Sequence, residues 1–252
     1  MSKKRKILFL DILTDDVKKR KRIEKYVYRG ATYADRIRRV CGIAENAFAA
    51  VDASKKTFPD PSGYRAIIIG GSTEDPVKGK EKTWMKKAYA FIRRAAKKRV
   101  PIFGICGGMQ FTVRALGGTV VNNKKGRHFG NANIQLTREG IKSTLFEGIG
   151  NTFTTQCNHR CIVDSIKPEW KVLAFSAYAR IEALAIGERI YLVEFHPERD
   201  LWGARASARM QKEALLYESL ATEKNFRMLV NALKDTSGVG RKILKNFIER
   251  IV

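Results

Sequence analysis

Two kinds of apolar pattern alternate along the first half of the chain. The first is a short, nearly continuous apolar run, which is typical of a strand buried on both faces of a parallel sheet. Such runs lie at residues 7–12, 48–51, 66–69 and 101–105. The second places apolar side chains three or four positions apart, which predicts helices. This spacing occurs at residues 33–46, 84–98 and 109–116. The alternation of the two patterns predicts an α/β fold.

Beyond residue 119 the runs become shorter and are typical of antiparallel strands, and beyond residue 205 the pattern is helical, with a break near Ser237 and Gly238. The short runs lie at residues 119–121, 132–136, 152–155, 172–176, 181–186 and 190–195. We therefore expect a doubly wound, flavodoxin-like, mostly parallel sheet with an antiparallel extension and extra C-terminal helices. Because no repeat or linker is evident, residues 1–252 are expected to form a single domain. Its core would span about 7–198, and 199–252 would be a helical elaboration.

The composition is that of a globular protein. Of 252 residues, 44% are hydrophobic and 10% aromatic, which excludes a disordered basic tail. Since no apolar run approaches the ~20 residues that a membrane-spanning helix needs, no membrane partner is expected. The basic start at residues 1–6 precedes an apolar run too short for a signal peptide. Four cysteines do not make a disulfide scaffold, so the expected localisation is cytoplasmic.

The net charge of +24, from 49 Lys and Arg against 25 Asp and Glu, is the unusual feature of the composition. It predicts attraction to nucleic acid or to another phosphate-bearing partner. Residues 1–40 carry 14 basic and 5 acidic side chains and residues 78–99 carry 10 and 1, so the charge is spread over several segments. The densest run, at residues 18–22, is either a phosphate-contacting patch or a solvated helix face, and the second interpretation is favoured.

A candidate nucleophile lies directly after the strand predicted at 101–105. Residues 104–108 read Gly-Ile-Cys-Gly-Gly and lead into a predicted helix, which is the nucleophile-elbow pattern with Cys106 in place of serine. The flanking glycines allow the sharp turn, and the helix N-terminus is expected to lower the pKa of the thiol. The alternative is a small buried cysteine at a tight turn.

A candidate base lies directly after the strand predicted at 190–195. His196 is followed by Pro197 and Glu198, and this spacing can place the carboxylate on the ring N–H that faces away from the sulfur. The other two histidines, His128 and His159, lack that arrangement. Residues 70–72, Gly-Gly-Ser, follow another buried strand, and there the bare backbone could donate an N–H to an oxyanion.

Together these segments resemble the motifs of the class I glutamine amidotransferases, in the order in which that family carries them. Residues 104–110 match Gly-x-Cys-x-Gly-x-Gln, residues 195–198 match Phe-His-Pro-Glu, and residues 69–72 resemble the loop that donates an oxyanion N–H. The resemblance covers residues 7–198 and is greatest to the GMP-synthase-like group. It implies the α/β fold of that family and a glutaminase activity.

The resemblance implies Cys106 as the nucleophile, His196 as general base and acid, and Glu198 as the residue that orients His196. The N–H groups of Gly71 and Gly107 would form the oxyanion hole. The Cys106 thiolate would attack the side-chain amide of L-glutamine, and His196 would protonate the departing ammonia. Water would then hydrolyse the glutamyl thioester.

Further residues are implied in substrate binding. Gln110 would contact the bound glutamine, and residues 155–160 resemble the segment whose backbone binds its amino acid moiety. This adds Asn158, His159 and Arg160 as candidates. Arg160 stands where members commonly have a small residue. Gly107 stands where many have a larger one, which would open the pocket.

This chemistry requires no metal and no cofactor. Cys157, His159 and Cys161 lie close together in the sequence, but a fourth ligand and the closed spacing of a cysteine pair are missing, so no metal site is expected. No P-loop or second domain is evident. The resemblance therefore implies a glutaminase that supplies ammonia to a separate synthetase chain, and the basic surface is a candidate docking site for an acidic synthetase.

Two alternative functions stay open. A γ-glutamyl peptidase or hydrolase would use the same three residues on a γ-glutamyl bond. A basic nucleic-acid-binding or regulatory module would keep the fold without the reaction, although the intact triad argues against it. After Glu198 the chain departs from the family, and residues 199–240 form either a lid or partner surface beside the triad or, as favoured, a helical hairpin packed on the outside.

Overall fold

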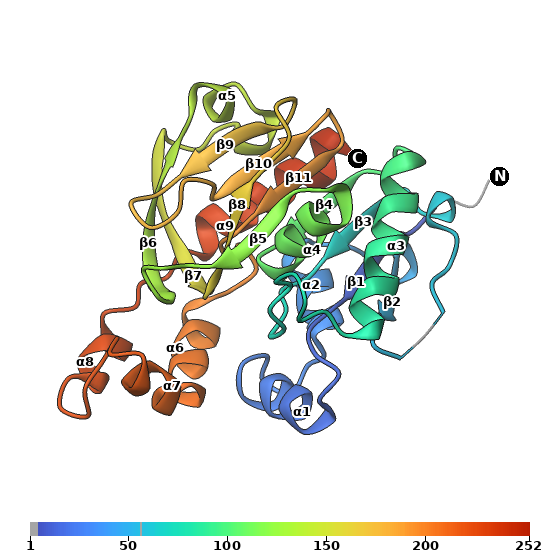
Figure 1. Ribbon diagram of the computed structural model, residues 1–252. Coiled ribbons are helices and arrows are strands. Elements are labelled where there is room, and N and C mark those ends of the chain that lie inside the picture. Colours follow the sequence, from blue (N-terminus) through green and yellow to red (C-terminus); the bar gives the residue numbers. More distant parts are fainter. Residues whose placement is uncertain (1–4, 56) are drawn as a thin grey trace.

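A mixed sheet of nine strands runs through the protein, as seen in a computed structural model that describes residues 5–55 and 57–252 (Figure 1). The basic start predicted at residues 1–6 lies partly outside the described residues. The strands, in spatial order, are β2 (Phe48–Asp52), β1 (Ile7–Asp11), β3 (Ala66–Ile69), β4 (Ile102–Ile105), β11 (Ile190–Val193), β10 (Ala183–Ile186), β9 (Lys171–Phe175), β6 (His128–Leu136) and β7 (Thr152–His159). The first five are parallel, and the last four continue the sheet antiparallel. This confirms the predicted fold class.

Helices cover both faces of the parallel strands, because the side chains of each strand point alternately to the two faces. In β1, Phe9 packs in one hydrophobic layer and its neighbour Leu8 in the other. The first layer contains α2 (Tyr33–Val40) and α9 (Ser237–Asn246), and the second contains α3 (Thr83–Lys97) and α4 (Gly107–Leu116). The carboxyl ends of β1, β3, β4 and β11 therefore meet at one edge, where ligands bind in folds of this class.

The remaining elements surround this framework. A two-stranded ribbon and five further α-helices lie around it in the part of the chain that the structure describes, besides three short 3₁₀-helices and a C-terminal π-helix: β5 (Thr119–Asn122) with β8 (Cys161–Ser165), α1 (Val17–Tyr26), α5 (Arg138–Ile141), α6 (Leu201–Met210), α7 (Lys212–Tyr217) and α8 (Phe226–Asn231). Helices α6–α8 share a small apolar cluster of their own. Figure 1 shows them projecting from the main sheet beside α1, to which Trp202 ties α6 by a hydrogen bond from its indole Nε1 to the Tyr26 carbonyl at 3.2 Å.

Two local differences from the sequence prediction have clear causes. The helix expected at 33–46 ends at Val40, because Gly42 adopts a left-handed φ of 65° and turns the chain away. The basic run at 18–22 lies in α1, but it is not simply a solvated face. Arg20 is buried and pairs with Asp11 at 2.7 Å and with Asp52 at 3.5 Å, so it anchors α1 to the ends of β1 and β2.

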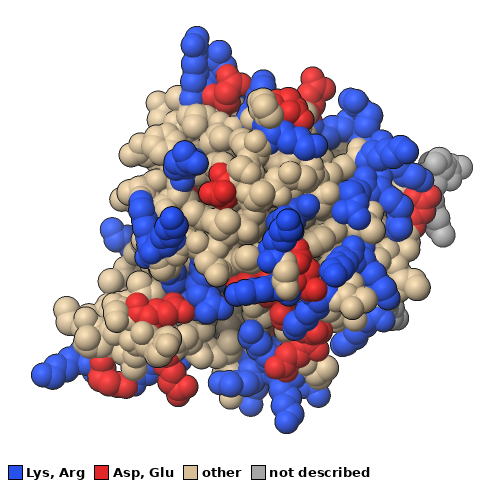
Figure 2. Space-filling view, viewed as in Figure 1, with Lys and Arg blue, Asp and Glu red and all other residues tan. Residues whose placement is uncertain are grey.

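Basic and acidic side chains are interspersed on the face of the molecule that Figure 2 shows. On the face shown in Figure 2, Lys and Arg side chains occur over several parts of the surface, with acidic side chains between them. Several are paired, such as Lys98 with Asp60 at 2.9 Å. Among the described residues, no helix is both long and apolar enough to cross a membrane.

Candidate active site

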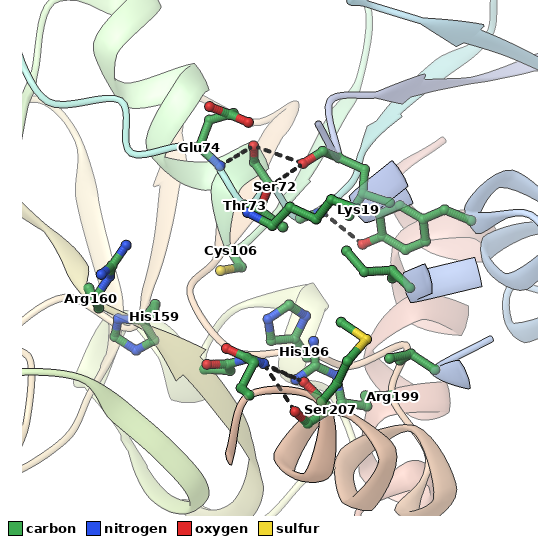
Figure 3. Close-up of a pocket in the computed structure, with 18 of the residues that line it drawn as sticks. Lys19, Ser72, Thr73, Glu74, Cys106, His159, Arg160, His196, Arg199 and Ser207 are labelled. Carbon is green, nitrogen blue, oxygen red and sulfur yellow. Dashed lines mark hydrogen bonds between the residues drawn. The ribbon is translucent and has the colours of Figure 1, made fainter. Parts of the chain in front are cut away.

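Cys106 occupies the sharp turn between β4 and α4. Its φ of 49° and ψ of −107° fall in a region that residues with a side chain rarely adopt, at a cost of about 1–3 kcal/mol. The Cys106 N–H donates to the Val193 carbonyl at 2.7 Å, and its carbonyl accepts the Gln110 N–H at 3.0 Å. The strained turn is thus held by β11 on one side and by α4 on the other. Figure 3 shows the thiol in the pocket at the carboxyl end of the sheet.

The glycines around Cys106 are required by close packing. A Cβ at Gly108 would lie 2.3 Å from the Ile69 carbonyl oxygen, so α4 could not approach the end of β3 with any larger residue there. A Cβ at Gly107 would lie 2.5 Å from the backbone nitrogen of Ser72. The expectation that Gly107 opens the pocket is therefore wrong, because the loop that follows β3 fills the space that a side chain would take.

His196 and Glu198 form a buried pair directly after β11. His196 Nδ1 and Glu198 Oε1 are 2.8 Å apart, which leaves Nε2 as the ring nitrogen available to a reactant. The His196 N–H donates to the Gln156 carbonyl at 2.8 Å, and Arg36 donates to the Glu198 carbonyl at 2.7 and 3.1 Å. Strand β7 and helix α2 thereby fix the position of the imidazole and its carboxylate partner.

Tyr33, at the start of α2, connects this pair to the predicted oxyanion loop. Its hydroxyl donates to Glu198 Oε1 at 3.2 Å and accepts the Gly71 N–H at 2.7 Å. In this conformation the Gly71 N–H is therefore engaged by a side chain. A role for Gly71 in the oxyanion hole stays a prediction, and it requires this hydrogen bond to open.

The protonation equilibria favour a neutral thiol next to a neutral imidazole. Burial, and then the Glu194 carboxylate, raise the pKa of the Cys106 thiol well above its usual range, although Arg199 opposes them. Burial and Arg199 lower the pKa of His196 in spite of Glu198. Burial would raise the pKa of Glu198, but His196 and Arg199 outweigh it and lower that pKa to about 2. The expected lowering of the Cys106 pKa by the N-terminus of α4 is thus overridden by its surroundings.

Seven of the nine predicted site residues line one cavity of about 190 Å³. They are Gly71, Cys106, Gln110, Asn158, His159, Arg160 and His196. Gly107 is buried beside Cys106 in α4, and Glu198 is buried behind His196. The structure therefore brings all the candidates to one place, although they come from separate segments of the chain.

Gln110 is engaged by the protein itself. Its side-chain Nε2 donates to the Cys161 carbonyl at 3.1 Å and to the Glu194 carboxylate. Glu194 is fully buried, and burial and the nearby Glu182 raise its pKa well above the usual range. Gln110 thus links α4 and the cavity lining to the buried Glu194.

The C-terminal helices form one wall of the cavity. Arg127, just before β6, donates to both carboxylate oxygens of Glu218, at 2.5 and 3.0 Å, and to Asn158 and Gln211 at 3.0 and 3.2 Å. Arg160 pairs with Asp75 at 3.3 Å and with Glu218 at 3.6 Å. Residues 199–240 are therefore not only a hairpin packed on the outside, because their polar side chains close the side of the pocket that faces β7.

Sequence reasoning missed several residues of this site. Tyr33, Arg36 and Arg127 hold the predicted side chains in place, and Ser207 and Gln211 contribute to the wall. None of them belongs to a motif. Their roles depend on contacts between segments up to 165 residues apart in the chain, which no local pattern reveals.

The strained cysteine turn, the His–Glu pair and the order of the parallel strands define an α/β protein with a buried cysteine and a histidine–carboxylate pair at the carboxyl edge of its sheet. Comparison with known families gives the class a name. The glutamine amidotransferase class-I family matches residues 37–207, which is more than half of the chain. The chain belongs to this family, as its motifs predict.

Individual relatives of the chain carry names of the same family or of GMP synthase. The glutamine amidotransferase-like protein chry6 of Gibberella zeae is 30% identical over 157 residues, 62% of each chain. GMP synthase of Borreliella burgdorferi is 35% identical over 52% of this chain but only 24% of its own length. A protein of Methanothermobacter thermautotrophicus, named as one subunit of a GMP synthase, is 26% identical over 55% of this chain and 66% of its own. The chain thus spans less than two thirds of the length of each of these relatives.

Solved structures show the same fold at low sequence identity. A glutamine amidotransferase from Thermotoga maritima superposes with a TM-score of 0.76 at 16% identity, covering 99% of both chains. A glutamine amido transferase from Methylobacillus flagellatus gives a TM-score of 0.70 at 14% identity, covering 99% of this chain and 96% of the other. The C-terminal helices are therefore included in the shared length.

Proposed function

We propose that the protein is a glutaminase that hydrolyses the side-chain amide of L-glutamine to glutamate and ammonia. The observation that carries the proposal is the geometry at the floor of the cavity. A cysteine in a strained strand-to-helix turn lines the same cavity as a histidine whose Nδ1 is bound to a buried carboxylate at 2.8 Å. This is the arrangement that thiol acyl transfer requires.

The reaction proceeds in two halves. His196 Nε2 takes the proton of the Cys106 thiol as the sulfur attacks the amide carbon of glutamine, and the oxyanion forms near the N–H groups of Gly107 and, once released, Gly71. The C–N bond breaks, and the proton passes from His196 to the leaving nitrogen as ammonia. Water then attacks the glutamyl thioester with His196 as base, glutamate is released, and His196 returns the proton to the sulfur, which regenerates the thiol.

Binding of the substrate explains how a neutral cysteine is activated. Burial raises the thiol pKa and holds the thiol protonated, so a proton transfer to neutral His196 must accompany the attack. The buried Glu198 stabilises the imidazolium that results, because its own pKa is lowered to about 2 and it stays ionised. The pair is thus unreactive at rest and becomes reactive when an electrophilic carbon occupies the cavity.

We further propose that the ammonia is used by a separate synthetase chain. Support comes from the relatives named GMP synthase, because the name of the Methanothermobacter thermautotrophicus protein describes it as one subunit of that enzyme.

The proposal is tested by measuring glutamate and ammonia from L-glutamine, alone and after addition of a lysate of the source cell. We expect equal amounts of both products, loss of turnover to background in Cys106→Ala, and normal turnover in Cys41→Ser, whose half-buried thiol lies outside the cavity. No ammonia from the wild-type protein under either condition would overturn it. Faster release of amines from γ-glutamyl peptides than of ammonia from glutamine would favour the γ-glutamyl peptidase instead.

A further inference from the structure

Four side chains with metal-binding atoms converge beside the cavity, and one of them, His159, also lines it. His128, Cys157, His159 and Glu182 each offer one ligand atom, and these atoms all lie within 4.8 Å of one another. All four residues are at least nine-tenths buried, with exposed fractions of 9%, 1%, 4% and 0%. Because isolated buried polar groups are costly, such a gathering in the interior of a sheet requires an explanation.

The register of the sheet creates the cluster. His128 in β6 lies directly opposite His159 in β7, and Gly130 lies opposite Cys157 two residues away on the same face. Glu182 comes from the segment just before β10, where its N–H bonds to the Ala174 carbonyl of β9 at 2.8 Å. Three backbone segments that are distant in sequence therefore present their donors to one point.

Three nitrogen and oxygen atoms of the cluster lack a hydrogen bond within the described residues, and His128 Nδ1 and Glu182 Oε1 lie 3.6 Å apart. His159 Nε2, His128 Nδ1 and Glu182 Oε2 are buried and have no hydrogen-bond partner there. An orphaned buried polar atom costs about 1–3 kcal/mol, so three in one place represent a large penalty. These are the lone-pair atoms that a cation would engage.

Neighbouring groups hold the side chains of the cluster in place, as the hydrogen-bond partners of metal ligands do. His159 Nδ1 lies 2.9 Å from the Cys161 carbonyl, which fixes the tautomer with its lone pair on Nε2. Ser176 donates its hydroxyl to the other oxygen of Glu182 at 2.6 Å, and the Tyr178 ring stacks on His128 at a centroid distance of 4.3 Å. The side chains are thus oriented by their neighbours.

We propose that His128, Cys157, His159 and Glu182 bind one divalent transition-metal ion, with zinc as the ion that this donor set fits best. Two imidazoles, a thiolate and a carboxylate are the ligands Zn²⁺ takes in tetrahedral sites, and the two anionic ligands balance its charge. Bonds of about 2.0–2.3 Å in a tetrahedron place ligand atoms about 3.3–3.8 Å apart, so small side-chain movements close the site.

The ligand set differs from the one that the sequence suggested. Cys157 and His159 belong to both, but Cys161 points its thiol at the Asn122 side chain at 3.4 Å and is not part of the cluster. The two missing ligands, His128 and Glu182, lie 29 residues before Cys157 and 25 residues after it. No ligand spacing in the sequence could reveal them.

The ion would act as a structural clamp. It would join β6 and β7 to the start of β10, directly behind the β7 segment that lines the cavity with Asn158 and His159. The catalytic steps proposed above do not pass through it, so the clamp and the glutaminase can be tested apart.

The test is metal binding by the full chain carrying Cys106→Ala, which removes the nucleophile's thiol as a rival ligand. Protein stripped with a chelator under reducing conditions is titrated with Zn²⁺ and, separately, with Co²⁺. We expect one metal per chain, visible d–d bands of tetrahedral cobalt, a thiolate-to-cobalt charge-transfer band, and a higher unfolding temperature with zinc.

Two ligand variants and a matched control locate the site. We expect Cys157→Ser to lose the charge-transfer band and His128→Gln to lower zinc affinity at least about tenfold. Cys41→Ser should leave both unchanged. If a ligand variant fails to fold, the cobalt spectrum of the parent protein still shows whether a thiolate binds the metal. Less than one tenth of a metal per chain, a cobalt spectrum without a thiolate band, or binding unaffected by Cys157→Ser would overturn the proposal.

Discussion

The resting state of Cys106 is decided by its immediate surroundings. The N-terminus of α4 favours a thiolate, but burial and Glu194 raise the pKa of the thiol well above its usual range. Burial and Arg199 at the same time lower the pKa of His196. The two groups are therefore both neutral near pH 7, and a preformed thiolate–imidazolium pair is not expected.

This protonation state predicts the pH dependence of alkylation. The rate constant for modification of Cys106 by iodoacetamide should rise with pH from about 6 to about 9 without a plateau, because the neutral thiol has to lose its proton first. The rate is measured by peptide mapping of the modified cysteine at each pH. A plateau already reached near pH 6 would show that the thiolate is formed at rest.

Replacement of Tyr33 by phenylalanine is expected to raise the turnover of glutamine. Tyr33→Phe keeps the ring packing against Phe9 and Tyr28 but frees the Gly71 N–H for the oxyanion. Since the lost hydrogen bond is worth about 1 kcal/mol, kcat for glutamine should rise about fivefold, while the free energy of unfolding falls by about 1–3 kcal/mol.

Steady-state kinetics and denaturant unfolding check both changes. Tyr28→Phe is the matched control. The Tyr28 ring stacks on the Tyr33 ring at a centroid distance of 4.9 Å, but the hydrogen bond from the Gly71 N–H goes to Tyr33. If kcat fell in Tyr33→Phe and not in the control, the hydroxyl would be needed to orient Glu198 rather than in competition with the oxyanion.

At the residue scale the sequence predicts what is local. Cys106, His196 and Glu198 are recognisable because each lies at a strand end within a short motif whose chemistry depends on adjacent positions. Tyr33 is not recognisable, because its role requires α2 to pack beside a carboxylate 165 residues further along.

At the scale of elements, the C-terminal helices complete the pocket through one charged anchor. The Arg127–Glu218 pair is mostly shielded from solvent, with exposed side-chain fractions of 10% and 19%. Arg127 and Arg160 lower the pKa of Glu218, so the carboxylate is ionised near neutral pH. The pair joins the end of α7 to the start of β6 across the cavity.

Glu218→Gln should therefore loosen this wall. We expect KM for glutamine to rise about fivefold with little change in kcat, corresponding to about 1 kcal/mol of lost binding, and limited proteolysis between α6 and α8 to become faster. Glu223→Gln is the control, because Glu223 is exposed and pairs only with Lys212 among the described residues. An equal effect in both variants would mean that overall charge, not this anchor, controls the wall.

The elements themselves were largely predictable. Buried strands such as β1, β3 and β4 are continuous apolar runs, and the parallel order follows from the alternation with helices. The position of α6–α8 could not be predicted from the sequence, because their apolar cluster is small and their placement depends on polar contacts such as that of Arg127 with Glu218.

At the scale of the whole molecule, the net charge is +24, and on the face that Figure 2 shows the Lys and Arg side chains occur over several parts of the surface. Glutamine has no net charge, so its turnover should not depend on the long-range field of the protein. We expect kcat/KM for free glutamine to change less than about twofold between about 0.05 and 0.5 M salt.

Binding of an acidic synthetase or of nucleic acid to the same surface would instead weaken steeply over that range. A steep salt dependence of the turnover of glutamine without a partner would show that the surface charge acts directly on the active site.

Formation of a covalent glutamyl intermediate on Cys106 is the step on which the proposed function depends. It is tested most directly by quenching the protein with acid during turnover of L-glutamine and determining its intact mass and the modified peptide. We predict a species heavier by one glutamyl group, located on Cys106, that is absent from Cys106→Ala and present in Cys41→Ser. Release of glutamate without such a species, and unchanged in Cys106→Ala, would contradict it.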